Sequence, residues 1–252
     1  MKVVILCGGL GTRLSEETSI RPKPMVNIGN RPILWHIMKS YEKYGFYDFV
    51  LALGYKGDYV KDYFINYHIK DSNITVNTST GKSVIENSPK ENWNVSLINT
   101  GSETLTGGRL LRLKYLLNET FMVTYGDGVS DVDISKLLEF HKKSGKVATV
   151  TSVRPPARFG GMKIVDGVVL EFKEKPQIGE GSINGGFFVF EPEIFDYLEN
   201  DKTILEREPL ENLAKNDQLA AFEHDGFWHC MDTIRDKESL NNLYNSGFKP
   251  WL

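Results

Sequence analysis

Glycines and cations gather directly behind the first apolar run of the chain. Residues 3–7 (VVILC) have the length and composition of a strand buried on both faces, and Gly8, Gly9 and Gly11 follow it. Because glycine has no Cβ, backbone N–H groups in such a loop can approach an anion closely. Three cations come next, and they make this stretch a predicted phosphate cradle: Arg13, Arg21 and Lys23.

Two common types of phosphate-binding loop can be excluded. No GK[ST] follows the glycines, so the loop is not a Walker motif, and GGxG followed by Thr-Arg is not the G-x-G-x-x-G of dinucleotide-binding proteins. A plain strand-to-helix turn is the alternative. The PKP tripeptide around Lys23 at this spacing favours the phosphate cradle.

Carboxylates at two later places suit a metal ion. Asp127 stands between two glycines behind an apolar strand at 121–124. Mg²⁺ is commonly held by one or two carboxylates together with substrate oxygens, so Asp127 is a candidate ligand, with a simple turn aspartate as the alternative. Asp232 is either the second ligand or the N-cap of the helix that follows. Asp131 and Asp133 are interpreted as turn and helix-cap residues.

A second polar group stands in the far half of the chain. Lys175 follows a strand at 168–172 and precedes Pro176, a setting that favours contact with a second phosphate over an ordinary surface position. Glu174 and Asn184 are candidates to bond sugar hydroxyls, and Gly185 allows close approach. The alternative for Asn184 is the start of a hairpin strand.

Arg109 is unusual in its local context. It stands at the expected start of a helix over 109–117, where the helix dipole disfavours a cation, so a bound anion or base would explain it. Thr104 and Thr106 are expected to cap that helix.

Strand and helix patterns alternate through the first half of the chain. This order predicts a doubly wound, Rossmann-like α/β sheet in one domain over 1–252, with hairpins in the later half, one of them turning at Asp166-Gly167. Residues 71–93 are polar and are expected to form an inserted loop or hairpin, with a possible role as a lid or subunit contact. Since ligands bind at the carboxyl ends of the strands, the polar groups above are expected to converge there.

Bulk composition excludes several classes of protein. A net charge of -3 gives no global attraction to nucleic acid, and no apolar run reaches the length of a membrane span. The first apolar run is too short for a signal peptide, so we expect a cytoplasmic enzyme. The two cysteines are Cys7, expected to be a buried free thiol, and Cys230.

Motifs along the whole chain resemble the sugar-1-phosphate nucleotidylyltransferases. They include CGGLGTRL, KPKPM, TLTGGRL, TYGDGVSD, FKEKP, INGGFFVF and MDTIRD. The resemblance implies a mixed-sheet, GT-A-like nucleotidyltransferase fold. One branch of this family transfers a cytidylyl group from CTP to α-D-glucose 1-phosphate with Mg²⁺. The chain resembles that branch in three segments: TLTGGRL, TYGDGVSD and the MDT tripeptide at 231–233. That reaction yields CDP-glucose and pyrophosphate for dideoxyhexoses of O-antigen-type polysaccharides.

The resemblance also implies a role for individual residues. Arg13, Lys23 and Asp127 would act in catalysis, Asp127 and Asp232 would hold the metal, and Lys175, Glu174, Asn184 and Gly185 would bind the sugar phosphate. The nucleotide would be held by Leu6, Cys7, Gly8, Gly9, Leu10, Gly11, Thr12, Arg13, Lys23, Thr104, Arg109 and Gly126. A homo-oligomer is implied, with a hexamer as the candidate assembly. Cys7 replaces the alanine usual in the family, which would make the site sensitive to thiol reagents.

Three other functions compete with this one. A thymidylyl- or uridylyltransferase would share the fold and differ in a few hydrogen bonds to the base. A non-catalytic nucleotide-sugar-binding regulatory subunit would keep the fold without the chemistry, but the chain retains the full set of charged candidates. A nicotinamide oxidoreductase is disfavoured by Thr-Arg behind the glycines and by the lack of an acidic residue after the second strand.

Overall fold

A seven-stranded mixed sheet forms the centre of the molecule. The structure is a computed structural model that describes residues 1–252 except 10, 71, 88–90, 155–160, 166–167 and 174–180, with backbone only at 161–165 and 168–173. The strand order is β14-β10-β13-β8-β1-β4-β7. The strands are β1 (Lys2–Cys7), β4 (Asp48–Leu53), β7 (Asn94–Asn99), β8 (Phe121–Tyr125), β10 (Ala148–Val153), β13 (Ile183–Phe190) and β14 (Leu219–His224).

One strand of this sheet runs against the others. β13 pairs antiparallel with both β8 and β10, whereas the remaining neighbours pair in parallel. The beginning of β13 therefore lies at the edge of the sheet where β1 and β8 end. The predicted doubly wound mixed α/β fold is confirmed, and the antiparallel strand explains how a residue at a strand start reaches the carboxyl edge.

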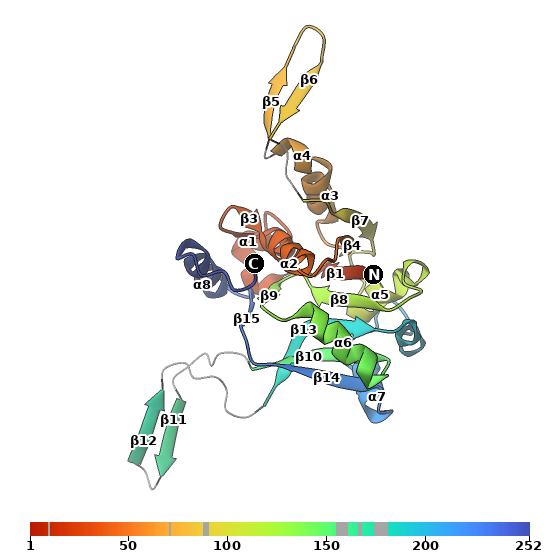
Figure 1. The fold of residues 1–252 in the computed structure, drawn as a ribbon, viewed down its shortest axis with the longest axis vertical. Helices are drawn as coiled ribbons and strands as arrows, with labels where there is room; N and C mark the ends of the chain where they lie inside the picture. The colour runs from red at the N-terminus through yellow and green to blue at the C-terminus, as the bar shows by residue number, and fades with distance from the viewer. Residues whose placement is uncertain (10, 71, 88–90, 155–160, 166–167, 174–180) are drawn as a thin grey trace.

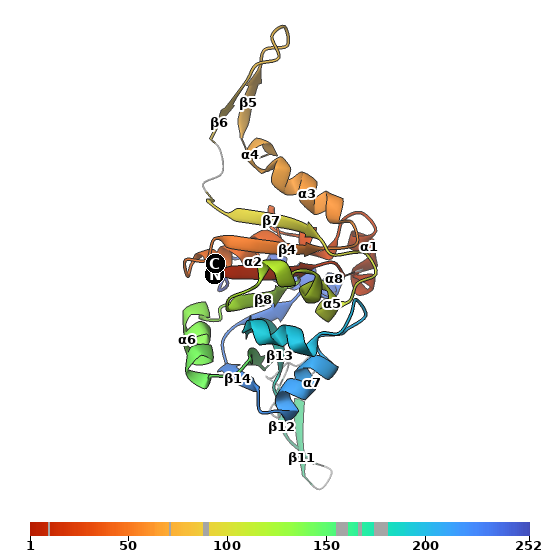
Figure 2. The same ribbon diagram turned by 90° about the vertical axis from the view of Figure 1, so that its right-hand side faces the viewer.

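Helices cover both faces of the sheet (Figure 2). Alternate residues of β1 divide between two cores: Val3 and Ile5 join the first, while Val4 joins the second. α2 (Ile33–Glu42), α3 (Gly57–Ile65), α6 (Ile134–Ser144) and α8 (Ile234–Asn245) contribute to the first core. The second takes side chains from α5 (Thr106–Arg112), a 3₁₀ helix (Pro192–Tyr197) and α7 (Glu208–Lys215).

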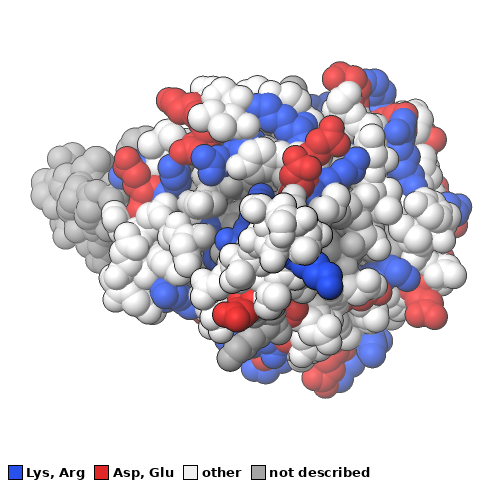
Figure 3. Space-filling model, turned by 90° about the horizontal axis from the view of Figure 1, so that it is seen from above, with Lys and Arg blue, Asp and Glu red and all other residues white. Residues whose placement is uncertain are grey.

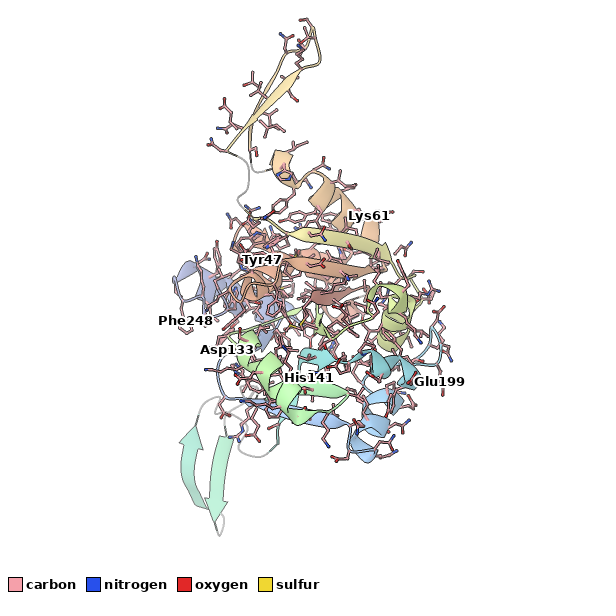
Figure 4. The ribbon with its side chains drawn as sticks, turned by 45° about the vertical axis from the view of Figure 1, so that its right-hand side comes forward. Tyr47, Lys61, Asp133, His141, Glu199 and Phe248 are labelled. Atoms are coloured by element: carbon pink, nitrogen blue, oxygen red, sulfur yellow. The ribbon has the colours of Figure 1, made fainter. Side chains whose placement is uncertain are left out.

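Local side-chain chemistry accounts for the helix ends. The Oδ1 atom of Asp133 accepts a hydrogen bond from Lys136 N at 3.0 Å and caps α6, as predicted (Figure 4). α3 ends before Asn66, whose side chain bonds the Asp62 carbonyl, and α4 (Tyr67–Lys70) follows. α7 begins at Glu208, where Pro209 suits the first turn.

Two hairpins extend away from the central sheet (Figure 1). β5 (Asn73–Val76) pairs with β6 (Ser83–Glu86), which confirms a hairpin within 71–93. β11 (Gly161–Val165) pairs with β12 (Val168–Lys173), as the Asp-Gly pair predicted. The structure also contains the short helix α1 (Ser15–Thr18), three further 3₁₀ helices (Thr12–Leu14, Lys23–Met25 and Lys114–Leu116) and two further strand pairs: β2 (Asn27–Ile28) with β3 (Arg31–Pro32), and β9 (Gly128–Ser130) with β15 (Trp228–Cys230).

Charges of both signs are mixed on the surface seen from above (Figure 3). No large area of that face carries one sign alone, in keeping with the net charge of -3. Within the described part of the chain, every helix is too short or too polar to cross a bilayer.

Candidate active site

A cavity of about 680 Å³ opens at the carboxyl edge of the sheet. This is a usual size for a site that takes a small ligand. It is lined by the ends of β1 and β8 and by the beginning of β13, three adjacent strands. The following predicted site residues all line it: Leu6, Cys7, Gly8, Gly9, Gly11, Thr12, Arg13, Lys23, Thr104, Arg109, Gly126, Asp127, Asn184, Gly185 and Asp232.

Lys23 joins two carboxylates at one end of this cavity. Its ammonium lies 2.6 Å from Asp127 Oδ2 and 2.5 Å from Asp232 Oδ1. The side chain of Lys23 is only 13% exposed, so little water separates the three charges. Both carboxylates therefore point at a single cationic centre, although they come from positions far apart in the sequence.

A short strand pair brings the two aspartates together. β9 starts directly behind Asp127, and Gly128 pairs with Cys230 of β15 in antiparallel register. The pairing continues as a hydrogen bond of 2.8 Å from Met231 N to the Asp127 carbonyl. Asp232 follows at once and so lies beside Asp127.

Asp232 is not the cap of the next helix. α8 is capped by Thr233, whose hydroxyl accepts from Asp236 N at 3.2 Å, and the Asp236 carboxylate completes the capping box. This leaves both oxygens of Asp232 free to face cations, Lys23 on Oδ1 and Arg13 on Oδ2 at 3.1 Å. Of the two interpretations of Asp232, the N-cap is wrong, and its role as the second metal ligand stays a prediction.

The charges shift one another's pKa values. Burial opposes the charge of Lys23, but Asp127 and Asp232 beside it outweigh burial and raise its pKa. Burial likewise acts to raise the pKa of Asp232, and the hydrogen bond and charge of Lys23, with Arg13 behind, lower it overall. Lys23 and Asp232 are thus both ionised near neutral pH.

The aspartate pair also fits a divalent cation. The described residues contain no group of three or more histidine, cysteine and acidic side chains of the kind that encloses a metal. Two converging carboxylates without further protein ligands match the way Mg²⁺ is held, where substrate phosphate and water supply the other oxygens. The donor set is all oxygen, as a hard cation requires.

Arg13 stands at the mouth of the cavity. Its side chain is 71% exposed, and its one ion pair, among those described, is with Asp232. Arg21, the third cation of the predicted cradle, does not line the cavity: it lies 3.7 Å from Glu17 Oε2, which it meets across one helical turn. The cradle therefore offers two cations to a ligand instead of three.

Arg109 is buried beneath the glycine loop and supports it through hydrogen bonds. It is 4% exposed, and its guanidinium donates to the carbonyls of Leu53, Gly101 and Gly8 at 3.2, 2.8 and 3.0 Å and to Thr100 Oγ1 at 2.8 Å. A Cβ at Gly8 would lie 2.1 Å from Arg109 Cζ, so this glycine is needed for the arginine. Burial lowers the pKa of Arg109 without removing its charge.

The helix beside Arg109 starts differently from the prediction. α5 begins at Thr106, its N-cap is Leu105, and no side chain caps it. Arg109 consequently lies in the last turn of a seven-residue helix, where a cation is favoured by the helix dipole. Both the threonine caps and the expected dipole conflict are wrong; contact of Thr104 and Arg109 with a cytidine stays a prediction.

Asn184 lies at the opposite wall, at the beginning of β13. Its Oδ1 accepts from Gly186 N at 2.8 Å, and Trp228 Nε1 donates to the Gly185 carbonyl at 2.7 Å. The predicted sugar-binding segment is thus held rigidly at the cavity. Three predicted site residues lie outside the described residues: Leu10, Glu174 and Lys175.

Burial disfavours the reactive thiolate form of both cysteines. Cys7 and Cys230 are both free, but Cys7 is 1% exposed and burial raises its pKa strongly. Burial and the Asp232 charge raise the pKa of Cys230 to about 12. Because the thiolate is the reactive form, these surroundings argue against the expected sensitivity of Cys7 to thiol reagents.

Some cavity residues were not predicted from sequence. Tyr125 precedes the Gly-Asp-Gly turn directly and Trp228 belongs to β15, and both line the cavity. The place of Tyr125 at a strand end was a usable signal. Trp228 gave none, because its role depends on the pairing of two three-residue strands.

The family model for nucleotidyl transferases matches residues 2–233 of this chain. The chain belongs to the nucleotidyl transferase family. The resemblance inferred from the motifs is therefore confirmed, and the protein is a nucleotidyltransferase.

Curated relatives match the chain end to end. Glucose-1-phosphate cytidylyltransferase of Salmonella typhi is 50% identical over 253 residues, covering 100% of this chain and 98% of that protein. A probable glucose-1-phosphate cytidylyltransferase of Bacillus subtilis is 46% identical, with 100% and 99% covered.

Solved structures share the fold. HddC of Yersinia pseudotuberculosis superposes with a TM-score of 0.70 at 27% identity, covering 96% of this chain and 99% of that one. UDP-glucose pyrophosphorylase in complex with UDP-glucose gives a TM-score of 0.67 at 19% identity, with 98% of each chain covered, and supports the fold alone.

Proposed function

We propose that this protein transfers a cytidylyl group from CTP to α-D-glucose 1-phosphate, forming CDP-glucose and pyrophosphate. The observation that carries the proposal is the full-length identity of 50% to a glucose-1-phosphate cytidylyltransferase. The cavity supports it, because cations for phosphates, carboxylates for a metal and an amide for a sugar line one space.

The chemistry needs no covalent enzyme intermediate. A phosphate oxygen of the sugar phosphate attacks the α-phosphorus of CTP in line, and pyrophosphate leaves on the opposite side. Arg13 and Lys23 neutralise the triphosphate, while the glycine loop and Gly126 hold the nucleotide in place. Asn184 and Gly185, with Glu174 and Lys175, bind the sugar phosphate.

Nucleotidyltransferases of this family generally use a divalent metal, and we propose Mg²⁺ here. Asp127 and Asp232 would hold it. When bound, Mg²⁺ supplies Lewis-acid stabilisation of the phosphate oxygens. The all-oxygen pair described above supports this choice over zinc, which prefers nitrogen and sulfur ligands.

A homo-oligomer, with a hexamer as candidate, is part of the proposal. The β5–β6 hairpin supports it, because apolar side chains are exposed on both strands, Val76 at 56% and Val84 at 59%. A cytoplasmic setting is supported by the two free thiols. A place in surface-polysaccharide synthesis rests on the resemblance alone.

Pyrophosphate release tests the reaction. The protein is incubated with glucose 1-phosphate, Mg²⁺ and one nucleoside triphosphate at a time. Release with CTP alone is the expected result. Release with dTTP or UTP would instead assign the base preference of the sister enzymes, and no release with any nucleotide would favour a non-catalytic sugar-nucleotide-binding subunit.

The sugar side has its own test. Lys175→Ala is expected to raise KM for glucose 1-phosphate more than KM for CTP, because Lys175 is assigned to the sugar phosphate. Steady-state kinetics with each substrate varied in turn measures both constants. The reverse order would mean that Lys175 serves the nucleotide.

A further inference from the structure

Glu206 links two walls of the cavity through hydrogen bonds. It lies between Leu205 and α7, and its carboxylate reaches Tyr125 and Thr106. Tyr125 Oη donates to Glu206 Oε1 at 2.6 Å, and Thr106 Oγ1 donates to Oε2 at 2.6 Å. Thr106 opens α5 beside the predicted nucleotide end, and Tyr125 ends β8 beside Asn184.

The Glu206 carboxylate and the Gly186 backbone N–H together set the directions of the bonds in this chain of groups. A carboxylate only accepts, so the hydroxyl of Tyr125 must donate to Glu206 and its oxygen is left to accept. Asn184 Nδ2 fills that place at 3.2 Å. The amide oxygen of Asn184 then faces Gly186 N, at 2.8 Å. The Asn184 amide therefore has one orientation, with Nδ2 toward Tyr125 and Oδ1 toward Gly186 N. Its second N–H and the second lone pair of Oδ1 consequently lie at defined positions.

Packing keeps Tyr125 in this arrangement. Its ring meets Phe188 edge-on at 5.8 Å between centroids and lies over Gly186, where a Cβ would come within 2.4 Å of Tyr125 Cδ2. Gly186 has a φ of 79°, which also favours glycine. Burial, together with the nearby Glu206 charge, raises the pKa of Tyr125, so the phenol remains a donor at neutral pH.

The other arm of Glu206 holds the start of α5. Thr106 Oγ1 donates to Glu206 and accepts from Leu205 N at 3.0 Å, so its hydroxyl is used in both directions. Backbone hydrogen bonds add to this contact, from Leu105 N to the Asp201 carbonyl at 2.9 Å and from Gly107 N to the Thr203 carbonyl at 3.0 Å, so the start of α5 is held to the segment before α7 at several points. α5 and α7 pack on the same face of the sheet (Figure 2).

We propose that Glu206 is a positioning residue for sugar selection, which acts through Tyr125 to hold the side chain of Asn184 at the sugar-1-phosphate end of the cavity. This inference rests on the proposed function. The Gly186 N–H fixes which end of the Asn184 amide accepts, and the bond from Tyr125 to Glu206 fixes where Nδ2 lies, so Asn184 offers a donor and an acceptor at set positions to neighbouring sugar hydroxyls. A sugar hydroxyl of the opposite configuration then finds no hydrogen-bonding partner, and Asn184 is left unpaired. A site of this kind discriminates effectively against the wrong sugar.

Glu206→Gln tests the polarity with nearly unchanged shape. The amide of glutamine can donate to Tyr125, so the phenol is free to turn its own O–H toward Asn184 Nδ2, where two donors meet and the Asn184–Tyr125 hydrogen bond is lost. We expect KM for glucose 1-phosphate to rise about tenfold, which corresponds to the loss of about one charged hydrogen bond. Discrimination against galactose 1-phosphate, measured as the ratio of kcat/KM values, should fall by a similar factor.

Tyr125→Phe separates the two arms of Glu206. It cuts the link to Asn184 and leaves the bond to Thr106, so the loss of sugar discrimination should match Glu206→Gln while KM for CTP stays within twofold of wild type. Glu199→Gln, at an exposed glutamate labelled in Figure 4, is the matched control and should change neither the sugar discrimination nor KM for CTP. Thermal unfolding of each variant reports on folding.

The outcomes separate this inference from the proposed function. If wild type releases pyrophosphate from CTP and glucose 1-phosphate, and both variants fold but keep wild-type sugar discrimination, the role of Glu206 is refuted. Equal increases in KM for both substrates in Tyr125→Phe would also refute it, because a general loosening would then explain the data. If wild type releases no pyrophosphate, the proposed function itself fails.

Discussion

Two arginines on the glycine-loop side of the cavity, both assigned to the nucleotide from motifs, have opposite surroundings. Arg13 is 71% exposed and has one ion-pair partner among the described residues, the carboxylate of Asp232. Arg109 is 4% exposed, and its guanidinium donates hydrogen bonds to three backbone carbonyls and to a threonine hydroxyl. The comparison shows that a cation at a motif position can serve either a ligand or the loop that holds the ligand, and only its partners distinguish the two.

Removal of Arg109 should give the largest effect. Arg109→Ala leaves several buried acceptors unsatisfied, and we expect the free energy of unfolding to fall by about 3 kcal/mol or more. Urea denaturation measures it. Arg112→Ala on the same helix is the control, because its ion pair with Asp201 is 44% and 47% exposed, and its loss should change the free energy of unfolding far less. A stable Arg109→Ala that fails only to bind CTP would reverse the comparison.

Asp127→Asn should abolish most of the activity without unfolding the protein. The substitution removes the negative charge of a proposed metal ligand and keeps the shape of the side chain, so kcat should fall about 10²–10³-fold. Stopped-time pyrophosphate assays give kcat, and circular dichroism checks the fold. Unchanged kcat would remove the metal assignment and leave Asp127 as a partner of Lys23 only.

Arg13→Gln sharpens the contrast from the exposed side. KM for CTP should rise about tenfold because one phosphate contact is lost. The unfolding midpoint in urea should stay at the wild-type value, since an exposed pair contributes little to stability. A large drop in stability here, as large as for Arg109→Ala, would mean that exposure does not separate the two roles.

The smallest effect is expected at Cys7, beneath the same loop. Its raised pKa and 1% exposure predict that iodoacetamide at neutral pH leaves the folded enzyme active. Mass spectrometry of labelled peptides, with urea-unfolded protein as the positive control, measures the modification. Rapid labelling of Cys7 in the folded state would show that the glycine loop opens.

Sequence patterns were most informative where the chemistry is local. The glycine loop, the strand before Asp127 and the hairpins at 71–93 and 166–167 all follow from short-range propensity, and the described parts of each agree with the structure. Apolar runs likewise predicted the strands at 3–7 and 121–124, which are β1 and β8, whereas the helix expected over 109–117 begins earlier, at Thr106.

Long-range pairing is what sequence patterns missed. The partnership of Asp127 with Asp232 depends on β9 and β15, each only three residues long, whose sequences carry no strand signal of their own. The burial of Arg109 depends on carbonyls from three separate loops. The link from Glu206 to Asn184 crosses from the loop before α7 to the start of an antiparallel strand. Such contacts form only once the sheet has placed distant segments side by side.

The β9–β15 pair carries one more consequence, which concerns synthesis of the chain. Asp127 leaves the ribosome a hundred residues before its partner, because the two aspartates are separated by 105 positions, 232 minus 127. Until β15 emerges and pairs, Asp127 has no second carboxylate beside it. The acidic pair therefore depends on a late segment of the chain: a copy truncated before β15 lacks Asp232, and Lys23 then has Asp127 as its one partner of the two.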